Sequence, residues 1–147
     1  MFYFYQVYYQ KAKEWGDTFD LGVFSNLEKA KKKIEQSKKC AGFKDDIEGF
    51  SILKFGVHVK SGVCKRKIKK LFFVNHEYSI EENGKTYDIW TQFDVFATLT
   101  EAKSKINKLR RSSRIGKKYP NNFEVSTVIV DNFSCWGEGF VDFGCNN

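Results

Sequence analysis

The sequence predicts an α+β protein in which a β-β-α-β unit occurs twice in tandem, forming an antiparallel sheet with helices packed on one face. The first observation behind this prediction is length, because 147 residues suffice for one domain or two small halves. The second is composition: 15 Phe, 7 Tyr and 3 Trp favour a core of rings on half-buried strands. The third is an internal repeat.

The repeat emerges when the chain is aligned with itself at an offset of 72 residues. Residues 23–34 (VFSNLEKAKKKI) and 95–106 (VFATLTEAKSKI) are identical at seven of twelve positions. Residues 49–55 and 122–128 correspond at an offset one residue larger, and apolar runs precede both helical blocks. A chance match of two helices would not also align apolar strands on both sides. We therefore predict a tandem duplication.

Apolar residues alternate with polar ones in three stretches of each copy, which is the pattern of half-buried strands. A polar turn joins the first two strands of each copy, at residues 13–17 and 81–85. The second of these turns contains Asn83-Gly84, a strong hairpin signal because both residues tolerate positive φ. The predicted strands are residues 2–9, 19–24 and 50–59 in the first copy and 71–80, 89–96 and 123–130 in the second.

One helix is predicted after the second strand of each copy. Ser25 with Glu28, and Thr98 with Glu101, have the spacing of a capping box at a helix N-terminus. Apolar residues then recur at helical spacing, and the alanine within each stripe would let the helix approach the sheet closely. The stripes are Leu27, Ala30 and Ile34 in the first copy and Leu99, Ala102, Ile106 and Leu109 in the second. A turn around Gly42, or at residues 116–120, leads to the third strand.

We accordingly predict three segments along the chain. They are a first β-β-α-β repeat at residues 1–60, a basic connector at 61–70, and a second repeat with a C-terminal extension at 71–147. The connector is rich in lysine and arginine and is expected to be exposed. The tail after Phe133 has no counterpart in the first repeat, and we expect it to cover a sheet edge.

The four cysteines, Cys40, Cys64, Cys135 and Cys145, form no C-x-x-C pair of the kind found in zinc or redox sites. They could form two disulfides, but the apolar N-terminus has neither a basic leader nor a small-residue cleavage site. No segment approaches the roughly 18 consecutive apolar residues of a membrane span. We expect a cytoplasmic protein with structural or incidental thiols, no membrane contact, no metal and no cofactor.

No catalytic site is predicted. The two histidines, His58 and His76, lie inside strand patterns, with no Ser, Cys or Asp nucleophile motif beside them. Histidines on strand faces are the simpler interpretation, although a metal-free ribonuclease that uses His and Lys stays open. Paired carboxylates fall in predicted turns, and no phosphate-binding loop or dinucleotide motif is present. We expect a binding protein and not an enzyme.

The net charge of +7, from 25 Lys and Arg against 18 Asp and Glu, favours an anionic partner. The basic residues concentrate in segments 29–39, 60–70 and 103–118. They can neutralise phosphates while exposed rings stack on bases, so a nucleic-acid-binding module is the alternative function. A solvated helix face is the simpler interpretation of lysines opposite an apolar stripe, and no glycine–aromatic RNA-recognition signature occurs.

Several short motifs resemble a small bacterial strand–helix domain seen near toxin systems. They are residues 22–30 (GVFSNLEKA), 42–43 (GF), 48–50 (EGF) and 136–140 (WGEGF). In general character the chain resembles immunity proteins of polymorphic or contact-dependent toxin systems. The resemblance covers each half loosely and its motifs are structural, so no functional residue carries over. It implies a non-catalytic immunity protein that binds and neutralises a cognate bacterial toxin domain.

Two basic stretches are the predicted partner-binding residues. Both combine charge with a loop or helix-end position, where core packing does not dictate the residue. Arginine is the better interface residue, since its planar fork pairs with carboxylates bidentately. Many immunity proteins are acidic because they block basic nucleases, so a nuclease partner of this basic chain would need an acidic face. The predicted residues are Lys65, Arg66, Lys67, Arg110, Arg111 and Arg114.

Overall fold

The computed structural model of the protein describes residues 1–10, 18–40, 42–43 and 47–134. The chain divides into two compact units, which we describe separately. The first is Met1–Gly56, Cys64–Lys69 and Ile129–Asn147, and the second is Val57–Val63 and Lys70–Val128. Each unit contains a three-stranded sheet and at least one α-helix, so the predicted α+β class is confirmed. The strands form two sheets of three and not one continuous sheet.

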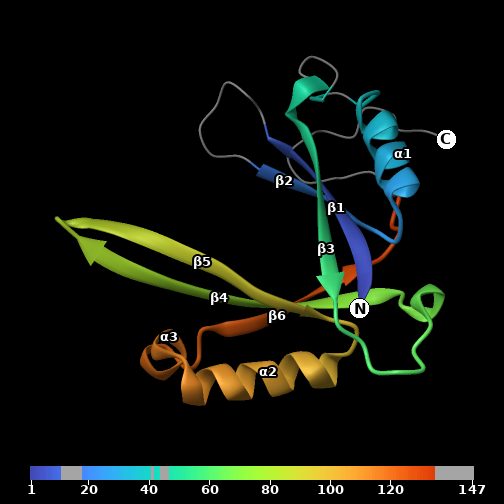
Figure 1. Ribbon diagram of the computed structural model, residues 1–147. Coiled ribbons are helices and arrows are strands. Elements are labelled where there is room, and N and C mark those ends of the chain that lie inside the picture. Colours follow the sequence, from blue (N-terminus) through green and yellow to red (C-terminus); the bar gives the residue numbers. More distant parts are fainter. Residues whose placement is uncertain (11–17, 41, 44–46, 135–147) are drawn as a thin grey trace. The chain divides into compact units, whose positions relative to one another are not determined.

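The first unit has its first strand in the middle of the sheet, in the order β2-β1-β3 (Figure 1). Strand β1 pairs with β2 antiparallel, and a register shift between Val7 and Tyr8 interrupts the pairing. Gly22, opposite Val7, adopts a φ of 116°, which glycine tolerates without strain. The elements are β1 (Phe2–Gln10), β2 (Thr18–Phe24), α1 (Leu27–Ser37), the 3₁₀ turn η1 (Ile47–Gly49), β3 (Phe50–Val57) and the 3₁₀ turn η2 (Lys65–Lys67).

The core of the first unit is built around rings on the face of the sheet that α1 covers. Tyr9 is fully buried, with its ring centroid 4.7 Å from that of Phe43 in an edge-on arrangement and 5.0 Å from that of Phe50. Ala30 of α1 is also fully buried in this cluster, and Ile34 packs against it. The prediction of an aromatic core under a helix with a central alanine is therefore confirmed for this unit.

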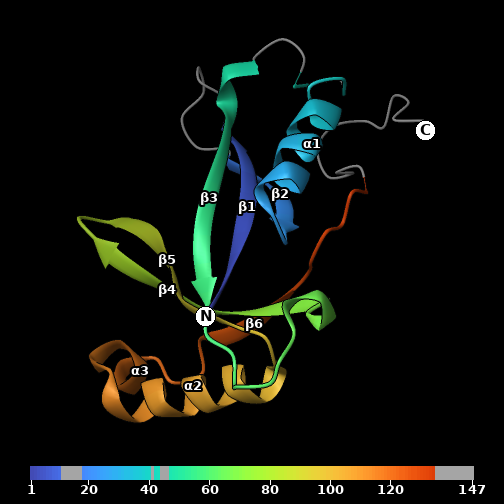
Figure 2. The ribbon, with the colours of Figure 1, turned by 45° about the vertical axis from the view of Figure 1, so that its right-hand side comes forward.

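The second unit has the strand order β5-β4-β6, again with its first strand in the middle. Helices α2 and α3 both lie along one face of this sheet (Figure 2). Val74, Ala102, Ile106 and Phe123 form the buried cluster between the sheet and α2. The elements are β4 (Lys70–Glu82), β5 (Lys85–Phe96), α2 (Leu99–Ser112), α3 (Arg114–Lys118) and β6 (Phe123–Ile129).

The hairpin between β4 and β5 turns at Asn83-Gly84, within the polar turn predicted at residues 81–85 and shorter than it. Asn83 and Gly84 have φ values of 52° and 73°, and two consecutive positive values are those of a type I′ turn. Strand β5 nevertheless begins at Lys85, four residues before the predicted start. Residues 85–88, which lie before the predicted strand, pair with the end of β4.

Three further details differ from the sequence predictions. Asn26, and not Ser25, caps α1, because its Oδ1 accepts the amide of Lys29 at 2.9 Å while Ser25 is bonded elsewhere. Thr98 does cap α2 as predicted. Where a turn was predicted at residues 116–120, α3 occupies residues 114–118.

Cys40 is disulfide-bonded, contrary to the expectation of thiols, whereas Cys64 is an exposed free thiol. The predicted turn at 13–17 and the predicted edge cover from residue 135 onward lie outside the described residues.

The tight fit of α2 on its sheet leads to a first prediction. Replacing the fully buried Ala102 by Leu should lower the free energy of unfolding by about 1–3 kcal/mol, because the added atoms push the helix off the sheet. Urea unfolding followed by circular dichroism measures this change. Ser104→Leu places the same side chain at an exposed position of α2 and should change stability little. Equal losses in both variants would contradict the close packing.

Candidate functional site

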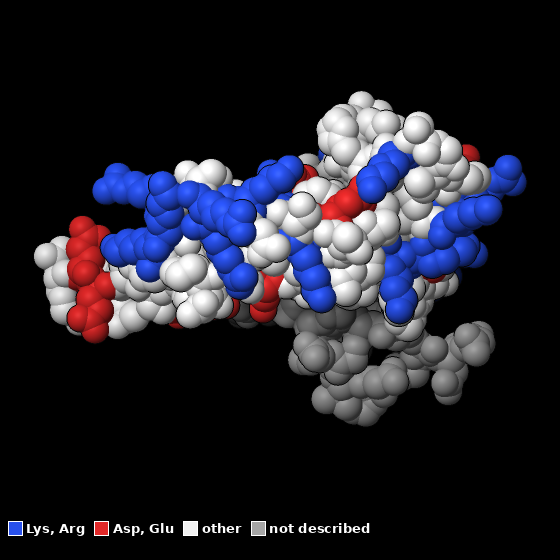
Figure 3. Space-filling model, turned by 90° about the horizontal axis from the view of Figure 1, so that it is seen from below, with Lys and Arg blue, Asp and Glu red and all other residues white. Residues whose placement is uncertain are grey.

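The exposed faces of α2 and α3 carry the densest group of positive charge in the second unit. Residues 99–118 contain eight lysine and arginine side chains and a single carboxylate, Glu101. Over these helices, lysine and arginine side chains cover much of the surface seen from below (Figure 3). We call the exposed members the α2–α3 basic surface: Lys103, Lys108, Arg110, Arg111, Arg114, Lys117 and Lys118.

Local structure explains why these side chains point outward from two short, connected helices. The apolar stripe of α2 faces the sheet, which leaves the charged positions to solvent. Ser113 ends α2 through its amide, which donates to the Leu109 carbonyl at 3.0 Å, and begins α3 by accepting the Gly116 amide at 2.8 Å. A Cβ on Gly116 would lie 2.1 Å from the carbonyl oxygen of Leu109, so only glycine fits this connection. The basic residues are therefore held on a defined backbone.

The cations on these helices differ in what they already bind. Lys105 pairs with Asp94 at 3.2 Å, and Arg110 donates from Nε to the Pro120 carbonyl at 2.7 Å. Lys118 lies with its Nζ 5.1 Å from the centroid of the Tyr119 ring. Within the described part of the chain, the remaining members of the surface make no side-chain hydrogen bond or ion pair. These are Lys103, Lys108, Arg111, Arg114 and Lys117.

The second predicted stretch, Lys65–Lys67, forms the 3₁₀ turn η2 in the first unit. Lys65 is partly buried, its Nζ lies 5.0 Å from the centroid of the Phe4 ring, and it donates to the backbone carbonyl of Ser25. Arg66 and Lys67 are exposed. The two stretches therefore belong to different units, and Lys65 is the member whose ammonium group is already engaged within its own unit.

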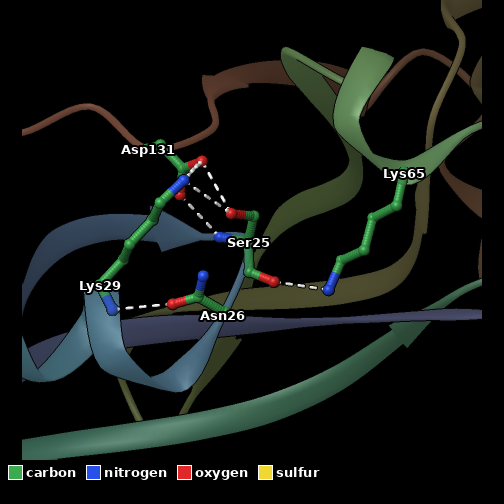
Figure 4. A network of polar contacts seen from close by, with 5 residues as sticks. All are labelled: Ser25, Asn26, Lys29, Lys65 and Asp131. Carbon is green, nitrogen blue, oxygen red and sulfur yellow. Dashed lines mark hydrogen bonds and ion pairs between the residues drawn. The ribbon is translucent and has the colours of Figure 1, made fainter.

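Lys65 belongs to a polar network that joins three distant parts of the sequence (Figure 4). Asp131, just after β6, accepts the Ser25 amide on Oδ1 at 2.7 Å and the Ser25 hydroxyl on Oδ2 at 2.8 Å. Lys29 of α1 donates from Nζ to the same Oδ2 at 2.6 Å. Asp131 also takes a φ of 60°, and its own amide donates to the Val23 carbonyl at 2.9 Å. The segment after β6 is thereby fixed to the turn between β2 and α1.

The network shifts the ionisation of two of its members. Burial alone would raise the pKa of Asp131, but the hydrogen bonds from Lys29 and Ser25 outweigh it and hold the pKa below the ordinary value of 3.8. Burial lowers the pKa of Lys65, an effect that nearby Asp131 opposes and Lys29 reinforces. Asp131 is thus charged at neutral pH and acts as the anionic centre that three donor groups share.

The two histidines do not form a common polar site. His76 is fully buried, with Nε2 3.0 Å from the Tyr119 carbonyl, so Nε2 carries the proton and Nδ1 has no partner among the described residues. His58 is exposed and forms an isolated parallel bridge with Phe96. In the described residues, no three His, Cys, Asp or Glu side chains come together as metal ligands.

One open cavity of about 490 Å³ lies where β6 begins beside β4. Its walls include the exposed carboxylates Glu77 and Glu124, together with Asn121 and Asn122. Neither histidine lines it, and the Ser79 hydroxyl in its walls donates to Asp88 Oδ1 at 2.6 Å. The cavity is therefore a shallow depression lined by carboxylate and amide side chains.

Comparisons with known proteins give no relative for this chain: no family model, no curated protein and no solved structure matches it. Among the described residues, no helix has the length and apolar character needed to span a membrane.

Sequence reasoning missed the Asp131 network entirely. Asp131 lies 106 residues from Ser25, and no local pattern connects them. The sequence offers one signal for this network, the pair Ser25-Asn26, because both residue types can cap a helix. When Asn26 is the cap, the Ser25 side chain is available for another contact.

The network leads to a pH-dependent prediction. Asp131→Asn keeps a residue that tolerates positive φ but removes the charge, and should cost about 1–2 kcal/mol at neutral pH. Because the pKa of Asp131 is depressed in the folded state, its stabilisation is complete above the unfolded-state value and is lost as pH falls through the folded-state value. Urea unfolding at a series of pH values should show the two proteins converging in acid.

Glu28→Gln is the matched control for this measurement, since Glu28 is an exposed carboxylate on α1, the helix that carries Lys29. It should change stability by no more than about 0.5 kcal/mol at any pH. A difference between wild type and Asp131→Asn that persists unchanged in acid would show that the carboxylate charge contributes nothing.

Proposed function

We propose that this protein is a non-catalytic immunity protein that binds and neutralises a cognate bacterial toxin domain through the α2–α3 basic surface. The observation that carries the proposal is the group of arginine and lysine side chains on this surface that have no partner of their own among the described residues. Arg111 and Arg114 lie at the junction of the two helices, where the backbone is fixed by Ser113 and Gly116. The partner implied by this chemistry is a protein with an acidic face.

Three properties of the surface support a protein partner. A rigid helical scaffold lets an arginine fork meet a carboxylate with little loss of backbone entropy. The charge is concentrated enough to steer a diffusing acidic partner. No aromatic residue occurs between positions 99 and 118, and the neighbouring Tyr119 is stacked on Tyr78 with ring centroids 4.7 Å apart. Platforms for single-stranded nucleic acid normally interleave exposed rings with their cations.

A nucleic-acid-binding module remains the second candidate function, because the same cations suit the phosphates of a duplex, which requires no stacking. The other basic stretch contributes to either proposal through Arg66 and Lys67, which are exposed, more than through Lys65. The two functions differ in salt dependence, since phosphate binding releases condensed counterions and weakens steeply as salt rises.

We infer that the units arose by tandem duplication of a β-β-α-β unit, which the seven identities in twelve aligned positions and the shared strand order support. We also place the protein in the cytoplasm, where it would meet an incoming toxin. Disulfides are rare in a reducing compartment. A cytoplasmic location therefore requires that the disulfide of Cys40 persists there. Cell fractionation with thiol labelling tests it.

The functional prediction concerns Arg111 and Arg114. Reversing both to Glu should slow association with the toxin about tenfold, because rim charges act mainly on the rate of encounter. The tagged protein captures its partner from the host lysate, and surface plasmon resonance then measures the rates for each variant. Lys31→Glu with Lys39→Glu is the matched control, since it changes the net charge equally at exposed positions of the first unit.

The same preparation separates the two candidate functions. A titration with duplex and single-stranded nucleic acid at about 0.15 M salt tests binding near physiological ionic strength. Micromolar or tighter binding there, with no protein captured, would overturn the immunity proposal in favour of the nucleic-acid module. Equal slowing by both charge-reversal pairs would place the toxin contact away from the α2–α3 basic surface.

A further inference from the structure

Strands β4 and β5 continue as a two-stranded ribbon beyond the rest of their sheet. Strand β6 begins at Phe123, and the amide of Glu77 donates to the Asn122 carbonyl at 3.2 Å, so β6 accompanies β4 only as far as Glu77. From there β4 and β5 pair only with each other up to the turn at Asn83-Gly84 (Figure 1). We call residues 78–91 the β4–β5 arm.

The arm exposes two large aromatic side chains. Trp90 is 56% exposed and Tyr87 is 47% exposed, and Ile89 between them is only partly buried. A two-stranded ribbon is marginally stable in water without further cover. Exposed apolar side chains on such a ribbon therefore favour an additional contact that buries them.

The outer edge of β5 is also open. In its sheet β5 is an edge strand, and among the described residues of the second unit the backbone pairing on its outer side is limited to the bridge between Phe96 and His58. Residues 85–95 therefore present unpaired backbone donors and acceptors along a strand that contains no proline. A long open edge of this kind is a template for pairing with a further strand.

We propose that β5 pairs with β5 of a second copy of this chain, forming a two-fold symmetric dimer with a continuous sheet. In an antiparallel pair, the side chains of directly opposite residues lie on the same face of the sheet. In a two-fold symmetric pair the symmetry axis must therefore pass between the two copies of one residue, which we call the central residue. Centred on Asp88, the pair would place two carboxylates opposite each other, which is unfavourable. Centred on Ile89, it places Asp88 opposite Trp90, Tyr87 opposite Thr91 and Thr86 opposite Gln92, with no like charges opposed.

The charges on the arm also favour this antiparallel arrangement. Glu81 and Glu82 lie beside the turn, and Figure 3 shows acidic side chains gathered at the end of the arm. Because β5 runs away from the turn, antiparallel pairing sends the two acidic tips to opposite ends of the dimer. The two Trp90 side chains become diagonal neighbours across the symmetry axis, at a separation of about 7–8 Å that aromatic rings can bridge.

The first test measures the mass of the full-length protein by sedimentation velocity over a wide range of concentration. Wild type should show twice the chain mass of 17.2 kDa when concentrated and dissociate on dilution. Ile89→Lys places two ammonium groups opposite each other and should weaken dimerisation at least about tenfold. Leu53→Lys, at a 48% exposed position on the edge strand β3 of the first unit, is the matched control and should dimerise like wild type.

A second test reads the register and does not depend on the stability of the lysine variant. In a Cys64→Ser background, which removes the exposed thiol, Ile89→Cys should cross-link two chains rapidly on mild oxidation. The facing Cβ atoms would lie about 4.5–5.5 Å apart. Thr86→Cys should not cross-link above the background of the parent, because its two copies would be roughly 20 Å apart.

Three results would overturn the proposal: wild type that is monomeric at every concentration, a dimer that Ile89→Lys leaves intact, or equal cross-linking at positions 89 and 86. A monomer would leave the arm to a different protein partner. The dimer proposal is independent of the toxin-binding proposal, since Arg111 and Arg114 lie outside β5 and can be tested in either oligomeric state.

Discussion

The close approach of one helix to a three-stranded sheet is the constraint on which each unit depends. Such a sheet offers one small face for burial, and Ala30 or Ala102 lets the helix lie against it. Because the apolar stripe is used inward, the charged residues of the same helix must lie outward or along its edges. A basic exterior is therefore first a consequence of folding. Function has to be sought in how individual cations are held, and not in their number.

The cations fall into two groups on that criterion. In the first unit, three of the four lysines of α1 contact the segment after β6. Lys29 binds Asp131, Lys33 donates to the Ser134 carbonyl at 2.7 Å, and the Nζ of Lys32 lies 5.5 Å from the Phe133 ring centroid. These side chains hold the fold together. In the second unit, Arg111 and Arg114 make no such contact with described residues. Two basic segments that look alike in sequence thus differ in whether their cations are bound within the described part of their own unit.

Most of the fold could be predicted because its signals are local. Alternation placed the strands, the Asn83-Gly84 pair placed the hairpin, and Thr98 with its helical stripe placed α2. Each signal depends on residues that are neighbours in the chain. The start of β5 was missed because its polar residues lie on an uncovered ribbon, where no burial selects for apolar side chains. The short helix α3 was missed because glycine and nearby proline indicate a turn, whereas Gly116 is needed here for close approach to Leu109.

The candidate site was less predictable, and for a different physical reason. The sequence selected Lys65, Arg66 and Lys67 equally, because all three carry the same charge in the same segment. What separates them is a contact between Lys65 and the Ser25 carbonyl, 40 residues away. No local pattern encodes that contact. The three arginines near the end of α2 were predicted from their position at a helix end. All three are exposed in the structure, because α2 has only one covered face.

Net charge is a poor guide to how this protein meets another molecule. In the second unit the β4–β5 arm is acidic near its tip, where Glu81, Glu82 and Asp88 are exposed beside a single lysine, Lys85, while α2 and α3 are strongly basic. Opposite charges gathered at separate places on one unit give it an oriented field, although the whole chain carries +7. Such a field turns an approaching partner as well as attracting it. The acidic partner proposed above would be drawn toward the helices and repelled from the arm tip, so the charge pattern would favour one orientation before any contact forms.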